Sequence, residues 1–93
     1  MRLSNKEIEL IKHKVKIIFG ETKIYLFGSR MDDSKIGGDI DLYIIPKLND
    51  NIFSKKIKIK TVLEDILFKP VDIVIARDIT RLIEQEAMKG IIL

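Results

Sequence analysis

The sequence predicts a small α/β (α+β) protein, in which helices flank a mixed β-sheet of three or more strands. Three observations support this fold class: helical spacing of apolar residues near the N-terminus, three short apolar runs typical of strands, and a long helical pattern between the second and third runs. The chain has 93 residues, of which 46% are hydrophobic and 33% are charged. This length and composition predict one folded domain over residues 1–93.

The first helix is predicted to run from about Asn5 to Phe19. Ser4 and Glu7 have the spacing of a capping box, in which each side chain accepts the backbone N–H of the other residue. Gly20 is a natural C-terminal stop. The apolar residues that define the buried stripe are Ile8, Ile11, Val15 and Ile18.

Two strands are predicted next, over Lys23–Phe27 and Asp39–Ile45, with a polar loop or short helical turn over residues 31–38. The first strand is apolar on both faces, which is typical of a central strand covered on both sides. The second strand is closed by Pro46. Its residues alternate between two faces: Ile40, Leu42 and Ile44 on one, Asp39, Asp41 and Tyr43 on the other.

A crossover helix over Ile52–Phe68 and a third strand over Val71–Ala76 follow, so the second and third strands are expected to be parallel neighbours. A last helix is predicted from Asp78, as its cap, to Lys89. The apolar end Ile91–Leu93 either packs back on the domain or contacts a partner in a homo-oligomer or hetero-oligomer. The predicted buried face of the last helix consists of Ile79, Leu82, Ile83 and Ala87.

Aspartates at the start of two strands indicate a metal site. Asp39 and Asp41 point to the same side of a strand, about 6.6 Å apart along the backbone. Their charges would repel each other beside an apolar sheet unless a cation lies between them, and Mg²⁺ prefers oxygen ligands. If the third strand lies beside the second, Asp72 adds a third carboxylate at the same end of the sheet. Three carboxylates can hold two ions for an in-line phosphoryl transfer.

Gly28, Ser29 and Arg30 follow the first strand and are predicted to bind phosphate. A glycine there allows close backbone approach, and the following N–H groups, the serine hydroxyl and the guanidinium are donors for a triphosphate. Ser29 is therefore interpreted as a phosphate ligand and not as a nucleophile, because the single histidine, His13, lies in the first helix.

The runs LFGSR, DIDLYII and VDIVIA resemble the glycine–serine, D-x-D and third-aspartate motifs of the DNA polymerase beta-type nucleotidyltransferase superfamily. They are most similar to its minimal nucleotidyltransferases, which include MntA-like antitoxins, and the ending MKGIIL is also like theirs. Residues 30–38 form a spacer one residue shorter than many minimal members have, and Gly37 and Gly38 replace a segment that often contains proline and serine.

The resemblance implies transfer of a nucleoside monophosphate, AMP from ATP above all, to a hydroxyl acceptor with two Mg²⁺ ions as cofactors. It implies catalytic and metal-binding roles for Asp39, Asp41 and Asp72, and nucleotide binding by residues 28–30. Minimal members often act as antitoxins that adenylylate a tyrosine of a helical HEPN-type toxin. Others work with a separate helical substrate-binding subunit, so the resemblance implies one of these two kinds of partner.

Two other functions stay open. One is a non-catalytic antitoxin or binding module that neutralises a partner protein by occlusion. The other is a small basic nucleic-acid binder, because the net charge is +3. Nucleic acid is the less favoured partner, since no aromatic residues interleave the lysines of residues 55–60. Without cysteine, a signal-peptide pattern or an apolar run of about 20 residues, we expect a cytoplasmic protein with no membrane partner.

Overall fold

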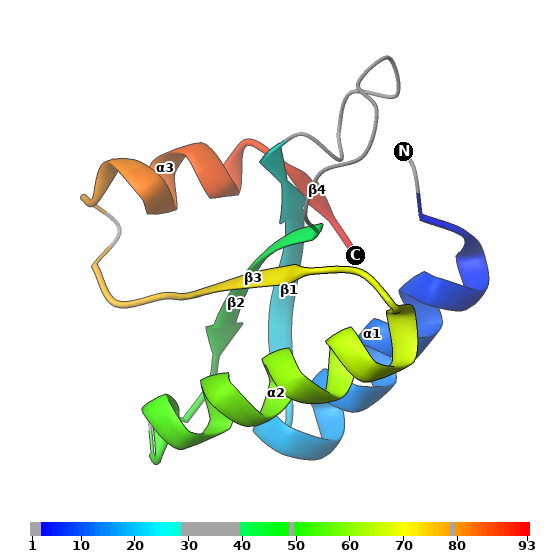
Figure 1. The fold of residues 1–93 in the computed structure, drawn as a ribbon. Helices are drawn as coiled ribbons and strands as arrows, with labels where there is room; N and C mark the ends of the chain where they lie inside the picture. The colour runs from blue at the N-terminus through cyan, green and yellow to red at the C-terminus, as the bar shows by residue number, and fades with distance from the viewer. Residues whose placement is uncertain (1–2, 29–39, 49, 79) are drawn as a thin grey trace.

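The computed structural model describes residues 3–28, 40–48, 50–78 and 80–93, which form three helices and a four-stranded sheet (Figure 1). The sheet has the strand order β3-β2-β1-β4. Strand β1 is antiparallel to both of its neighbours, whereas β3 is parallel to β2, so the predicted mixed sheet is confirmed. The elements are α1 (Asn5–Phe19), β1 (Thr22–Phe27), β2 (Ile40–Pro46), α2 (Ile52–Leu67), β3 (Val71–Ile75), α3 (Leu82–Met88) and β4 (Ile91–Ile92).

Helix α1 has the predicted bounds because local signals determine both of its ends. The Ser4 hydroxyl accepts the backbone N–H of Glu7 at 3.1 Å, and the Glu7 carboxylate accepts the N–H of Ser4 at 3.0 Å. Gly20 follows the last helical residue and has a φ of +78°, a backbone conformation that residues with a Cβ atom rarely adopt. The predicted capping box and glycine stop are therefore confirmed.

Helices cover both faces of the sheet, as expected for a central strand that is apolar on both sides. Helices α1 and α2 lie next to each other on one face, and α3 lies on the other (Figure 1). The larger core contains Ile24 and Leu26 of β1, and the smaller core contains Phe27 of β1, with Tyr25 packed against it. The alternation of β1 thus supplies both cores.

Helix α2 makes the predicted crossover between parallel strands. The last two turns of α2 also hold the start of β3, since the Lys60 ammonium donates to the Val71 carbonyl at 2.6 Å and the Glu64 carboxylate accepts the Val71 N–H at 2.9 Å. The observed strand bounds differ slightly from the prediction. Strand β2 includes Pro46, which pairs with Thr22, and β3 ends at Ile75.

The prediction for the last helix was wrong at its start and on its buried face. Asp78 accepts hydrogen bonds from Thr80 in a turn, and α3 begins only at Leu82. Leu82 and Ile83 are 79% and 41% exposed, whereas Glu84 is buried and Ala87 alone fits the prediction. The remaining predicted residue, Ile79, lies outside the described residues.

The apolar C-terminal residues pack back on the domain, which was one of the two predicted outcomes. Ile91 and Ile92 form β4, which pairs with Leu26 and Tyr25 of β1. Leu93 donates its N–H to the Ile24 carbonyl at 2.8 Å and packs against the larger core. In the described ranges, no helix has the length and apolar character needed to cross a bilayer.

Candidate active site

The sheet topology brings three strand ends together at one edge of the molecule. Because β1 is antiparallel to β2, the end of β1 lies at the start of β2, where Phe27 pairs with Asp41. Because β3 is parallel to β2, its start lies there too, and Asp41 is in register with Asp72. The predicted proximity of these two aspartates is confirmed. The predicted site residues Ser29, Arg30 and Asp39 lie outside the described residues.

Gly28 lies directly against the Asp41 carboxylate. A Cβ atom on residue 28 would overlap the Asp41 Oδ2 atom and would lie 3.1 Å from its Cγ atom. The φ of Gly28 is +75°, so the backbone conformation also favours glycine. The sequence predicted close backbone approach at this position, and the structure shows that the approached group is the aspartate of the next strand.

Asp72 is a solvent-accessible carboxylate with a lysine nearby. Its side chain is 58% exposed, and its Oδ1 atom lies 4.0 Å from the Lys60 Nζ atom. The same ammonium contacts Glu64 at 3.2 Å and the Val71 carbonyl. In the sequence, Lys60 was considered only as one of the lysines of residues 55–60. Its four-residue spacing from Glu64, in the second half of the predicted crossover helix, was the only signal that could have suggested a role at the strand start.

The donors that the structure brings together suit a hard divalent cation. Asp41 and Asp72 present carboxylate oxygens from neighbouring parallel strands, and Mg²⁺ commonly binds one or two protein carboxylates together with substrate phosphates. Within the described part of the chain, no three histidine, cysteine, aspartate or glutamate residues form a metal-binding group. The described residues therefore supply two of the three predicted ligands.

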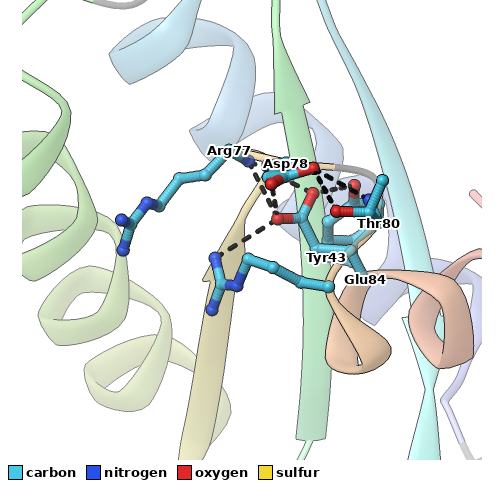
Figure 2. Close-up of polar contacts among 6 residues, drawn as sticks. Tyr43, Arg77, Asp78, Thr80 and Glu84 are labelled. Carbon is cyan, nitrogen blue, oxygen red and sulfur yellow. Dashed lines mark hydrogen bonds and ion pairs between the residues drawn. The ribbon is translucent and has the colours of Figure 1, made fainter.

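A second polar cluster, which was not predicted from the sequence, lies on the sheet face that carries Tyr43 (Figure 2). Glu84 is only 1% exposed, and its carboxylate accepts the Tyr43 hydroxyl at 2.7 Å and the Asp78 N–H at 2.8 Å. It also accepts the Arg77 N–H at 3.1 Å and a guanidinium N–H of Arg81 at 3.2 Å. These bonds connect α3 to β2 and to the turn after β3. This cluster could not be inferred from the sequence, because a glutamate in a helix normally faces water.

The cluster shifts the pKa values of its two buried groups. Burial raises the pKa of the Glu84 carboxyl, but the hydrogen bonds from Asp78, Tyr43 and Arg77 and the charge of Arg81 outweigh burial, so this pKa lies below its ordinary value of 4.5. Burial and the hydrogen bond to Glu84 raise the pKa of Tyr43 to about 12. At neutral pH the pair is therefore a carboxylate that accepts a hydrogen bond from a neutral phenol.

The family model described as "Polymerase beta, Nucleotidyltransferase" matches residues 5–93 of this chain. The match spans nearly the whole sequence, including every strand of the candidate site. The chain therefore belongs to the polymerase beta nucleotidyltransferase family, which confirms the resemblance that the three motifs carry. No curated protein sequence matches the chain.

Solved structures show the same fold at low sequence identity. A mutant toxin–antitoxin complex MntA-HpeT contains a chain with 24% identity and a TM-score of 0.70, and the match covers 94% of this chain and 68% of that one. A Shewanella oneidensis structure of a tri-AMPylated HEPN toxin in complex with an MNT antitoxin gives 26% identity and a TM-score of 0.66. That match covers 90% of this chain and 64% of the other. The chain thus spans about two thirds of the length of these neighbours.

Proposed function

We propose that this chain is a Mg²⁺-dependent nucleotidyltransferase that transfers AMP from ATP to a tyrosine hydroxyl of a HEPN-type toxin and so acts as an antitoxin. The observation that carries the proposal is the register of Asp41 with Asp72 beside the Gly28 backbone, in a chain of the polymerase beta family. The similar fold of chains from two toxin–antitoxin complexes, one with a tri-AMPylated HEPN toxin, supports the partner and the transferred group.

Each site residue has a distinct part in this reaction. Asp39, Asp41 and Asp72 would hold the metal, which supplies charge neutralisation and a lower pKa for the acceptor hydroxyl when bound. Asp72 is exposed enough to accept the hydroxyl proton. The Gly28 and Ser29 N–H groups and Arg30 would hold the triphosphate. The acceptor oxygen bonds to the α-phosphorus, and pyrophosphate leaves with the electron pair of the broken P–O bond.

The open position of the site favours a protein acceptor. Asp72 lies at the start of the edge strand β3, and more than half of its side chain is accessible to solvent. Binding by a second protein would exclude water from such an open site and strengthen its electrostatic interactions. The same surface would then serve both as catalytic site and as contact with the toxin.

Intact-mass measurement of both proteins tests the proposal. The full chain is incubated with a purified HEPN-type toxin, ATP and Mg²⁺, and we expect the toxin to gain one or more adenylyl groups. Asp41→Asn and Asp72→Asn should each slow the gain by roughly a hundredfold or more, because several kcal/mol of charge stabilisation are lost. Asp65→Asn is a matched control, since Asp65 is an exposed carboxylate of α2.

The outcomes separate the proposal from its alternatives. Unchanged transfer by both site variants would contradict the assigned roles. A stable complex without any adenylylation, equally inhibitory with Asp41→Asn, would support neutralisation by occlusion instead. In either case, circular dichroism must show that the variants are folded.

A further inference from the structure

A second surface feature lies along the open edge of β3, away from the aspartates. It is a groove of about 330 Å³ between α2 on one face of the sheet and α3 on the other. Its floor is the second half of β3, Ile73–Ile75, whereas Asp72 lies near the opposite end of the strand. The remaining lining residues are Ile52, Phe53, Lys56, Arg77, Arg81 and Ile83.

The groove combines exposed apolar side chains with cations. Phe53 is 76% exposed and Ile83 is 41% exposed, although both are large apolar residues. Three cations line the groove, and none of its described lining residues is acidic. Arg81 binds the buried Glu84, but the side chains of Lys56 and Arg77 form no ion pair with any residue that the structure describes. Figure 2 shows the Arg77 side chain extending away from the Glu84 carboxylate.

The groove also offers backbone hydrogen-bonding groups. The Ile40 N–H donates to the Pro70 carbonyl and the Ala76 N–H donates to the Ile44 carbonyl, so the even-numbered residues of this segment face β2. By the alternation of a strand, the N–H and C=O groups of Ile73 and Ile75 point to the outer edge. No further strand pairs with β3 in the described sheet. Such an edge is a template for an added strand.

Charge decides which kind of chain suits this edge. In a two-fold homodimer formed through β3, the groove of one subunit would face the groove of the other. The three cations of one groove would then lie against the same three cations of the second groove. Like charges in contact are unfavourable, which disfavours a second copy of this chain. Nucleic acid would satisfy the cations and its bases can stack on Phe53, but it has no peptide backbone to pair with the outer edge of β3.

We propose that the groove binds an extended acidic segment of a partner protein, which adds to the sheet alongside β3. Acidic side chains of the segment pair with Lys56 and Arg77, and its apolar side chains cover Phe53 and Ile83. The proposal rests on the proposed function only in assuming that a partner protein exists. Binding is measured without ATP or Mg²⁺, so failure of this proposal and failure of the transfer reaction are distinguishable.

The probe is a synthetic peptide of about seven residues that alternates glutamate and valine, added to the full ¹⁵N-labelled chain. We expect amide shifts to concentrate at residues 53, 56, 73–77 and 83, and the Ile73 and Ile75 amides to gain protection from hydrogen exchange. Lys56→Glu with Arg77→Glu should raise the Kd on the order of tenfold, as two exposed ion pairs become repulsive. Phe53→Ser should also raise it, and exposure of Phe53 makes misfolding unexpected.

A matched pair of substitutions controls for net charge. Lys12→Glu with Lys16→Glu makes the same charge change on α1, beside the opposite edge of the sheet, and should change the Kd by less than about twofold. Equal weakening by both pairs, or peptide shifts centred outside the groove, would overturn the proposal. So would tighter binding of a short single-stranded oligonucleotide in the same groove, or a homodimer in sedimentation that Lys56→Glu with Arg77→Glu dissociates.

Discussion

Glu84→Gln is the substitution that tests the buried cluster most directly. The side chain keeps its shape, but one carboxylate oxygen becomes an NH₂ group. One Glu84 oxygen accepts both the Tyr43 hydroxyl and the Arg77 N–H, and the other accepts the N–H groups of Arg77, Asp78 and Arg81. Wherever the NH₂ group lies, it therefore faces at least one donor. The tyrosine hydroxyl can turn to accept, but the backbone N–H groups cannot.

The expected cost follows from the kind of bonds lost. Hydrogen bonds to a charged group contribute about 1.5–3 kcal/mol each, against roughly 1 kcal/mol for neutral pairs. Removing one partner of a buried ion pair costs about 3–5 kcal/mol. Because Gln keeps some of the bonds, we expect the free energy of unfolding to fall by about 3 kcal/mol at pH 7. This is a large part of the roughly 5–15 kcal/mol typical of a domain.

The loss depends on pH with a definite sign. Since the pKa of Glu84 in the folded protein lies below 4.5, the unfolded state binds this proton first, and the carboxylate stabilises the fold above that pH. Its contribution is lost as the pH falls through the folded-state pKa. The gap in stability between the native chain and Glu84→Gln should therefore narrow from pH 7 towards pH 3. Other carboxylates titrate in both proteins, so the difference isolates Glu84.

Urea unfolding followed by circular dichroism measures the gap. With a slope of about 1.5 kcal/mol per molar, the urea midpoint should fall by about 2 M at pH 7. Leu82→Ala is the control, because Leu82 begins the same helix but is 79% exposed. It should change the midpoint little. A gap of equal size at pH 3 and pH 7, or a Glu84→Gln midpoint no lower than that of the control, would refute the reasoning.

Two further predictions test the site glycine and the buried phenol. Gly28→Ala and Gly20→Ala both place a Cβ at positive φ, and each should lower the free energy of unfolding by about 1–3 kcal/mol. Only the Cβ at residue 28 would displace Asp41, so only Gly28→Ala should abolish adenylyl transfer. Equal transfer by both variants would contradict this expectation. The pKa of Tyr43 rises from 10.0 to about 12, so the native chain should lose roughly 3 kcal/mol between these pH values as the unfolded state releases the proton first. Tyr43→Phe should lack this alkaline loss in urea unfolding, and an unchanged loss would assign it to other groups.

Local signals made most of the fold predictable from the sequence. The Ser4–Glu7 capping box defines the start of α1 and Gly20 defines its end, and both signals involve only residues that are close together in the sequence. The parallel pairing of Asp41 with Asp72 follows from one general rule, that a helix between two neighbouring strands makes them parallel. Because these signals need no knowledge of distant contacts, a pattern along the chain was enough.

Helix α3 and Lys60 were not predictable in the same way. Helical periodicity alone selects Leu82 and Ile83 as a buried face, but the turn after β3 needs an acceptor for two backbone N–H groups, and Glu84 supplies it. Turning Glu84 inward leaves Leu82 and Ile83 outside. The contact of Lys60 with Asp72 likewise depends on how α2 packs beside β3. In both cases the tertiary arrangement decides which polar group finds a partner.

The position of β3 connects the proposed site with the proposed groove. Asp72 lies near the start of this edge strand and Ile75 at its end, about 10 Å apart at the usual rise of a strand. A segment added alongside β3 would follow the same line as far as Ile73, because the outward backbone groups of Val71 are already bonded to Lys60 and Glu64. A side chain only a few residues from the docked part would then reach the carboxylates, so a hydroxyl acceptor on the partner needs no enclosing pocket in this chain. Docking on the edge would thus orient the acceptor hydroxyl towards the carboxylates.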